Sequence, residues 1–417
     1  MAKLKGVIFG VENVLIKRGN LAPHTETLEA TGKLMRFLRK QGVESVVMTN
    51  REWGWTHNGI QTPLQQAIEN RWNVKLNWFQ CAKGGVPAKQ TADSIKYVRE
   101  SRGWTANETL FIGNTDNDMR ASVNGKILLL NAEWYAKTME YGFHFDCPKE
   151  VARFIDTFCF REHFWYFKID DGPLQVYSLA PFSTMFGDET KYYSENFIWN
   201  VKNGFAQDEE FWAKMLATSM YFSGIYESVD YVAAYPKHEA GKYQKLLLLP
   251  MTTFAKCFRK DYIADLIHRH TTALKSQHYR KDVNHQTQLD TIHLCQFPHK
   301  LVKGEMRQYA KCPIVPGKTV LVIDDVCTKG MSFEAARHYL MKAGAKVICV
   351  SFLKALKHSY ESLSQVPLAS AFAPNTIKEV TPEKTYSLAL HVVDKQAQTE
   401  LHDRLQRYQK WDWPTDV

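Results

Sequence analysis

Two adjacent carboxylates, Asp324 and Asp325, directly follow the apolar run 320–323. A short glycine-containing loop with Thr328 comes next, and a helical pattern then begins with Ser332 as the expected N-cap. Backbone N–H groups of such a loop at a helix N-terminus bind phosphate, and the hydroxyl groups add donors. The two carboxylates can accept hydrogen bonds from neighbouring hydroxyls. A ligand with a phosphate at one end and a diol at the other fits a ribose 5-phosphate. The alternative interpretation of this segment is an ordinary surface loop with a helix cap.

This segment resembles the motif of the type I phosphoribosyltransferases that binds 5-phosphoribosyl 1-pyrophosphate (PRPP), in which an apolar run precedes DDVxTTGxT. The matching residues are Asp324, Asp325, Val326, Thr328, Gly330 and Ser332. Lys329 replaces the second threonine of the motif and adds an ammonium beside the phosphate. The resemblance implies that Asp324 and Asp325 are the catalytic residues that hold the ribose hydroxyls. It implies substrate contacts from Thr328, Lys329, Gly330, Met331 and Ser332.

A second segment agrees with this resemblance. The expected strand 229–234 leads into Tyr235, Pro236 and Lys237. In the ComF-like members of the family, a similar strand ends in a proline-containing loop that holds the pyrophosphate. The resemblance therefore adds these three residues to the substrate site, with Arg280 as a further cation for the pyrophosphate. It covers about residues 195–358.

The resemblance implies displacement of pyrophosphate from PRPP by an unidentified acceptor, or the reverse reaction, with Mg²⁺ bound mainly through PRPP. One alternative is a regulator that binds PRPP or a nucleotide without turnover. Another is an effector of bacterial stress or phage defence that acts with a protein or nucleic-acid partner. The sequence leaves the acceptor and the alternatives open.

The first 150 residues resemble the haloacid dehalogenase (HAD) superfamily through four motifs in order. The segment 6–16 is similar to motif one, 45–50 to motif two, and 111–118 to motif four. The positions that correspond to HAD site residues are Gly10, Glu12, Thr49, Lys89, Asn114 and Asp118. Lys89 stands where the motif-three lysine is expected.

Three departures from the HAD pattern determine the expected chemistry. Gly10 stands where the family has its nucleophilic aspartate, so no aspartyl-phosphate can form. Glu12 stands at the acid/base position, and Asn114 replaces a carboxylate near the magnesium ion. We therefore expect no phosphatase activity. Thr49 and Lys89 could still bind a phosphate, and the alternative is a unit kept for packing or partner contacts.

The elements that must position these residues alternate between strand and helix. Strands are expected at 4–9, 43–48, 109–112, 126–130, 229–234, 320–323 and 346–352, and helices at 28–41, 92–101, 150–160 and 333–343. This order predicts an α/β fold with two Rossmann-like domains and mostly parallel sheets. The HAD-like domain is expected at 1–160. The phosphoribosyltransferase-like domain is expected at 161–417, with a C-terminal extension that includes an amphipathic helix at 397–413.

The composition bounds the class of protein. The chain has 417 residues, 45% of them hydrophobic and 23% charged, and its net charge of +9 favours anionic ligands without choosing among them. Its eight cysteines form no CxxC pair, and no apolar run is long enough to cross a membrane, so a cytoplasmic protein is expected. The histidines between 268 and 293 match no metal-ligand spacing, so no protein-held metal site is predicted. Homo-oligomer formation stays open.

Overall fold

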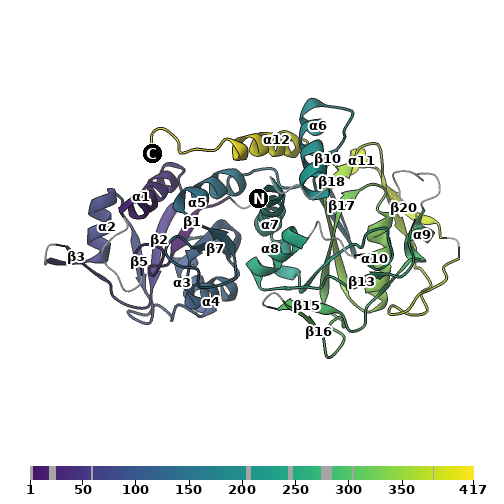
Figure 1. Ribbon diagram of the computed structural model, residues 1–417, viewed down its shortest axis with the longest axis horizontal. Coiled ribbons are helices and arrows are strands. Elements are labelled where there is room, and N and C mark those ends of the chain that lie inside the picture. Colours follow the sequence, from purple (N-terminus) through teal and green to yellow (C-terminus); the bar gives the residue numbers. More distant parts are fainter. Residues whose placement is uncertain are drawn as a thin grey trace.

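The structure, a computed structural model, describes residues 3–17, 25–57, 60–202, 208–242, 248–273, 284–302, 305–378 and 380–417. They form two α/β units side by side, each built on a six-stranded sheet (Figure 1). The predicted fold class is thereby confirmed. The domain boundary near residue 160 stays a prediction, because one apolar cluster runs from the first sheet through α5 and α7 into the second.

The first sheet has the strand order β5-β2-β1-β6-β7-β8, and every neighbouring pair is parallel. Its strands are β1 (Gly6–Phe9), β2 (Glu44–Thr49), β5 (Asn77–Gln80), β6 (Thr109–Gly113), β7 (Leu128–Ala132) and β8 (Phe143–Phe145). Its helices are α1 (Thr25–Lys40), α2 (Leu64–Trp72), α3 (Ala92–Arg102), α4 (Asp116–Asn124) and α5 (Pro148–Phe154), and β3 (Gly54–His57) and β4 (Ile60–Pro63) form a hairpin. The central strands are continuously apolar because helices cover both faces: α1 packs on the side of Phe9, and α3 and α4 on the side of Ile8.

The second sheet has the order β12-β11-β17-β18-β10-β9, parallel throughout except for the antiparallel edge pair of β9 and β10. Its strands are β9 (Phe167–Asp171), β10 (Leu174–Phe182), β11 (Tyr231–Ala234), β12 (Asp261–Tyr262), β17 (Thr319–Cys327) and β18 (Lys346–Ala355). The edge hairpin thus precedes the segment of about 195–358 that carries the family resemblance. Its turn lies at Gly172 and Pro173.

Helices cover both faces of the second sheet as well. They are α6 (Asp188–Phe197), α7 (Glu209–Phe222), α8 (Leu248–Phe258) and α10 (Met331–Lys342), with the short α9 (His285–Leu289) and α11 (Leu388–His391) nearby. Three small hairpins complete the unit: β13 (Ile267–Arg269) with β14 (Ile292–Leu294), β15 (His299–Val302) with β16 (Glu305–Gln308), and β19 (Tyr360–Leu363) with β20 (Pro382–Tyr386). Helices α7 and α8 pack on the face of Leu321 and Ile323, whereas α10 packs on the face of Val320 and Val322.

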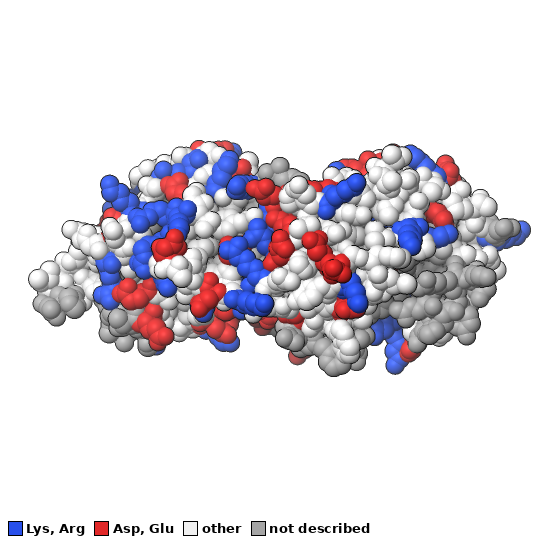
Figure 2. All heavy atoms as spheres, turned by 90° about the horizontal axis from the view of Figure 1, so that it is seen from above, with Lys and Arg blue, Asp and Glu red and all other residues white. Residues whose placement is uncertain are grey.

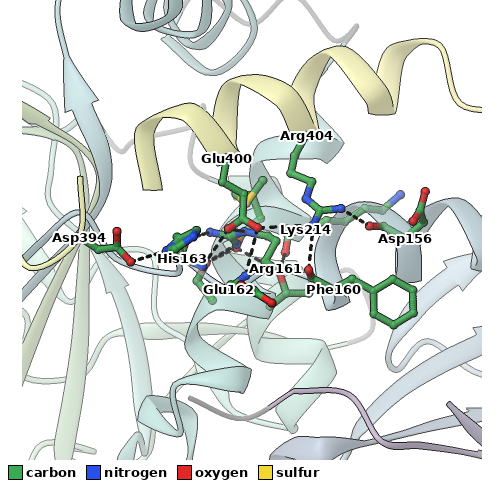
Figure 3. Close-up of polar contacts among 12 residues, drawn as sticks. Asp156, Phe160, Arg161, Glu162, His163, Lys214, Asp394, Glu400 and Arg404 are labelled. Atoms are coloured by element: carbon green, nitrogen blue, oxygen red, sulfur yellow. Dashed lines mark hydrogen bonds and ion pairs between the residues drawn. The ribbon is translucent and has the colours of Figure 1, made fainter. Parts of the chain in front are cut away.

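Helix α12 (Gln396–Gln409) joins the two units. Its buried residues recur at helical spacing and face the core: Ala397, Leu401, Leu405 and Tyr408. Arg404 donates hydrogen bonds to the carbonyl groups of Asp156 (2.6 Å) and Phe160 (2.8 Å), at the end of the first unit (Figure 3). The expected C-terminal amphipathic helix is therefore present, and it lies across the junction.

Glu400 of the same helix stabilises the chain where it enters the second unit. It accepts hydrogen bonds from the backbone N–H groups of Glu162 (3.1 Å) and His163 (2.9 Å). Its carboxylate lies 3.8 Å from Nε of Arg161, whose side chain is buried (Figure 3). Burial lowers the pKa of Arg161 to about 10, and Glu400 acts in the opposite direction. Removing the Glu400 carboxylate would leave the Arg161 guanidinium buried without it, so the stability of the junction depends on Glu400.

The surface seen from above mixes both signs of charge (Figure 2). Lysine and arginine side chains lie next to aspartate and glutamate over the first unit and the junction. On this face, the described residues form no continuous basic surface of the kind that nucleic-acid binding uses. Of the helices that the structure describes, none combines the length and the hydropathy needed to span a bilayer.

Replacing Glu400 with alanine should lower the free energy of unfolding by about 2–4 kcal/mol, because Arg161 then stays buried without its carboxylate partner. Urea denaturation of the full chain measures this loss. Asp403→Ala, at an exposed position of the same helix, is the matched control and should change stability by less than about 0.5 kcal/mol. Equal stability of the two variants would contradict the assignment of Glu400 to the junction.

Candidate functional site

Each sheet reverses its direction of winding between two adjacent parallel strands. In the first sheet the chain runs from β1 outward to β2 and β5, then returns to the other side of β1 with β6 and β7. In the second it runs from β11 to β12, then returns to the other side of β11 with β17 and β18. In doubly wound sheets, ligands bind outside the carboxyl ends of the strands at such a switch point. The residues predicted for the two sites follow these strands, so the fold offers two candidate sites.

The first switch point brings together the residues predicted from the HAD resemblance. Glu12, Thr49, Lys89 and Asp118 line one small cavity of about 70 Å³. Gly10 lies directly beside it, because a Cβ atom built on this residue would be 2.9 Å from Oδ1 of Asp118. The order of four weak motifs in the sequence therefore corresponds to a spatial cluster.

An ion pair occupies the centre of this cluster. The ammonium of Lys89 contacts Oδ1 of Asp118, and both side chains are almost fully buried. The other oxygen of Asp118 accepts hydrogen bonds from the backbone N–H groups of Asn114 (3.0 Å) and Thr115 (2.9 Å), and from the Thr115 hydroxyl (2.8 Å). These bonds hold the first turn of α4 against β6. This pair leaves little space for a side chain at position 10, where the HAD pattern has its nucleophile.

Asn114 is held inside the fold by its amide group. Its Nδ2 donates hydrogen bonds to the carbonyl groups of Ala132 (2.6 Å) and Ala136 (2.8 Å), and its Oδ1 accepts one from Asn13 (3.0 Å). The residues present do not fit a magnesium site of the HAD type, because Gly10 supplies no carboxylate and Asp118 is paired with Lys89. Among the described residues, no group of three or more His, Cys, Asp or Glu side chains is arranged to hold a metal ion.

Two residues that the sequence did not single out close the rim of the cavity. Arg51 forms an ion pair with Glu12 (2.5 Å) and lies over the ring of Trp53, 4.4 Å from its centroid. The Thr49 hydroxyl donates to the Arg51 carbonyl (3.0 Å) and accepts from Nε1 of Trp53 (2.8 Å). Binding of a phosphate by Thr49 and Lys89 stays a prediction, and the structure places both groups in internal contacts.

The second switch point holds the acidic pair. Asp324 and Asp325 are the sixth and seventh of the 9 residues of β17, which extends to Cys327 beyond the expected end at residue 323. The reason is that β18 continues to pair with this segment, through Val326 with Leu353 and Cys327 with Lys354. Each aspartate accepts a hydrogen bond from the next backbone N–H group, at 2.9 Å and 2.6 Å. Local bonds thus fix the direction of both carboxylates.

The predicted phosphate loop, Thr328 to Gly330, leads directly into α10. The expectation that Ser332 caps this helix is wrong: the N-cap is Gly330, with φ of +85°, and Ser332 lies in the first turn. The left-handed conformation of Gly330 starts the helix two residues earlier. A side chain at Gly330 would also meet the ring of Tyr360 at 2.2 Å. No side chain caps the helix, and Met331 and Ser332 are half-buried beside its N-terminus.

Lys329 is paired with Glu361, which sequence reasoning missed. Its Nζ lies 2.9 Å from the Glu361 carboxylate, and its carbonyl accepts a hydrogen bond from the Glu361 N–H (2.9 Å). Glu361 lies on β19 (Tyr360–Leu363), well beyond the end of the motif at Ser332, so no local pattern predicts this contact. The ammonium predicted to stand beside the phosphate is therefore shared with a carboxylate.

The residues predicted to hold pyrophosphate lie on the neighbouring strand edge. Tyr235 is buried; its backbone N–H donates to the Ile323 carbonyl (3.0 Å) and its hydroxyl to Gln288 (2.8 Å). Burial raises the pKa of Tyr235, so its hydroxyl stays protonated. Arg269, a residue that the sequence did not single out, donates from Nε to the Lys237 carbonyl (2.6 Å). The structure thus anchors the loop at Tyr235 and Lys237 beside β17.

Two further predicted residues complete the inventory of this edge. Pro236 is buried, and Lys237, the next residue, is half-buried. Arg280 lies outside the described residues. The structure thus places Asp324 and Asp325, the 328–332 loop and the 235–237 loop at one switch point.

Lys89→Met should lower the free energy of unfolding by about 3 kcal/mol, because it leaves the Asp118 carboxylate buried without its ammonium partner. The double variant Lys89→Met/Asp118→Asn removes both charges and should recover part of this loss. Denaturant titration of the full chain measures both, with Lys83→Met at an exposed position as the control. A single variant as stable as the wild type would show that the pair is not the centre of this site.

Gly10→Asp alone should create no phosphatase activity. The new carboxylate needs space that Asp118 holds, and Asn114 offers an amide where a metal ligand is needed. Hydrolysis of p-nitrophenyl phosphate with Mg²⁺ should therefore stay at the wild-type background. Magnesium-dependent hydrolysis by this variant would mean that the site is a phosphatase lacking only its nucleophile.

Comparison with known proteins gives a likeness to part of the chain. No family model matches it, and no curated protein matches it. A HAD-superfamily hydrolase of subfamily IA from Geobacter sulfurreducens is 12% identical with a TM-score of 0.23, over 36% of this chain and 94% of that chain. The cobalt-bound deoxy-D-mannose-octulosonate 8-phosphate phosphatase from Haemophilus influenzae is 18% identical with a TM-score of 0.23, over 31% of this chain and 68% of that chain. A likeness of this size assigns neither a family nor an activity.

Proposed function

We propose that the chain binds PRPP at the switch point of the second sheet and transfers its phosphoribosyl group to an acceptor, with release of pyrophosphate. The observation that carries the proposal is the coincidence of three features at one strand edge. These are the carboxylates of Asp324 and Asp325, the uncapped N-terminus of α10, and the anchored loop that holds Lys237. Together they match the diol, the 5-phosphate and the pyrophosphate of a single ligand.

Each group has a chemical task in the proposed reaction. The loop 328–332 binds the 5-phosphate and so positions the sugar. The acceptor forms a bond to the anomeric carbon while the bond to the pyrophosphate oxygen breaks, and positive charge develops on the ring. Asp324 and Asp325 hold the ribose hydroxyls and favour this charge, while Lys237 stabilises the leaving pyrophosphate. Mg²⁺ enters with PRPP, bound to its pyrophosphate.

The second candidate function is binding of PRPP or a nucleotide without turnover. One observation favours it: Gly10 stands where the HAD pattern has its nucleophile, and the ion pair of Lys89 and Asp118 lies at the centre of the first switch point. Because the first site lacks the nucleophile of its pattern, the second site can likewise bind its ligand without catalysing a reaction. The two candidates share the ligand and differ only in the release of pyrophosphate.

Titration calorimetry of PRPP with Mg²⁺ tests the site itself. The wild type should bind, and Asp324→Asn/Asp325→Asn should weaken binding by about 100-fold, because two charge-assisted hydrogen bonds to the ribose are lost. Asp170→Asn/Asp171→Asn is the matched control, since this aspartate pair lies on the edge strand β9 of the same sheet. It should bind as the wild type does.

Pyrophosphate release separates the two candidates. The wild type is incubated with PRPP, Mg²⁺ and a panel of nucleobases, amines and cell extracts. Release that the Asp324→Asn/Asp325→Asn variant lacks supports the transferase, whereas binding without release supports the regulator. Absence of PRPP binding by the folded wild type would contradict both.

A further inference from the structure

The side chain of Lys354 ends directly beneath the predicted phosphate loop. This residue lies near the end of β18, paired in register with Cys327, and its exposed fraction is 0%. Its ammonium donates hydrogen bonds to the carbonyl groups of Thr328 (2.5 Å) and His358 (2.6 Å). A lysine with no exposed surface is unusual in a folded protein and requires compensation.

The compensation of this buried charge is incomplete. Within the described part of the chain, no carboxylate forms an ion pair with Lys354. Its other close neighbour is the ring of Phe167, with the centroid 5.2 Å from the ammonium. Burial lowers the pKa of Lys354, which reflects the cost of keeping a charge there. Two carbonyl groups solvate an ammonium, but they do not neutralise it.

The loop above Lys354 is held from the inside through its carbonyl groups. The carbonyl of Thr328 points to Lys354, and that of Lys329 accepts the Glu361 N–H at 2.9 Å. In a trans peptide the N–H group points opposite to the preceding carbonyl. The N–H groups of Lys329 and Gly330 are therefore directed away from these inner contacts. This is the direction that a loop needs in order to present its amides to an anion.

Lys329 plays a different part from Lys354. Its side chain is 43% exposed and its ammonium is paired with Glu361 at 2.9 Å, so a carboxylate offsets its charge. The charge of Lys354 has no such carboxylate partner among the residues that the structure describes. A phosphate bound on the outer side of the loop would stand near this second charge, with one peptide layer between them.

We propose that Lys354 is a positioning residue for a phosphate monoester bound at the 328–332 loop. Its hydrogen bond to the Thr328 carbonyl turns the loop amides outward. Its positive charge is offset by the bound anion. This inference rests on the proposed function and deepens it. It identifies the 5-phosphate as the part of the ligand that this buried charge selects. The effect on the ligand runs through the loop, since Lys354 itself has no exposed surface.

The test compares four variants by calorimetry, with PRPP and with ribose 5-phosphate as probes. Lys354→Met should weaken binding of both probes by a similar factor of about tenfold or more, because both carry the 5-phosphate. Lys354→Arg keeps the charge and should recover part of that loss. Lys357→Met, at an exposed position three residues further on, should bind both probes as the wild type does. Lys237→Met should weaken PRPP alone, since ribose 5-phosphate lacks the pyrophosphate.

A spectroscopic measurement on the wild type keeps the test independent of how the variants fold. Lysine labelled with ¹³C at Cε gives one resonance that is absent from Lys354→Met. This resonance should shift when ribose 5-phosphate saturates the protein, and a lysine with a purely structural role would not respond. The wild type could bind ribose 5-phosphate without any shift of the Lys354 resonance, or Lys354→Met could bind it as tightly as the wild type. Either result overturns the inference and leaves the proposed function intact. Absence of binding by the wild type overturns both.

Discussion

The reversal of winding between adjacent parallel strands is the constraint on which both candidate sites depend. Parallel strands present their carboxyl ends at one edge, and at the reversal the helices leave to opposite faces and open a crevice there. In this chain the same constraint acts twice, between β1 and β6 and between β11 and β17. Residues from segments far apart in sequence therefore meet at two edges, and the side chains there decide what each edge can do.

Two buried lysines distinguish these edges. At the first, the ammonium of Lys89 meets the Asp118 carboxylate, so the charge is satisfied within the protein and the family's nucleophile position is crowded. At the second, the ammonium of Lys354 donates to two carbonyl groups and forms no ion pair with a carboxylate of the described residues, so its charge is solvated without being neutralised. A site whose charges cancel internally has little electrostatic reason to bind an anion. The charge at the second edge is not cancelled in this way, and the same edge carries Asp324 and Asp325, which we propose to hold the sugar.

Sequence patterns predicted seven strands of the two sheets, the helices α1, α3, α5, α10 and α12, and the clustering at each edge, because apolar periodicity and strand-end motifs are local signals. They did not predict the sheet strands β5, β8, β9, β10 and β12. They misplaced the cap of α10, since the helix begins at Gly330 in a left-handed conformation, where the ring of the distant Tyr360 leaves no room for a side chain. Glu361 and Lys354 were missed for the same reason: both reach the loop from other strands. The extent of β17 was underestimated because a strand end is determined by its partner. The function of α12 at the junction also lay beyond local pattern, as Glu400 acts on residues more than 200 positions earlier.

Hydrogen–deuterium exchange of the full chain with and without PRPP and Mg²⁺ tests the central claim most directly, because both edges are read in one experiment. We expect slower exchange in peptides that cover residues 324–333 and 235–238, with no change in those that cover 10–13, 49–51 and 114–118. Slower exchange at the second edge alone would agree with a ligand site there and with an ion pair at the first edge that is already formed within the protein. Protection at the first edge, or at neither, would contradict the account.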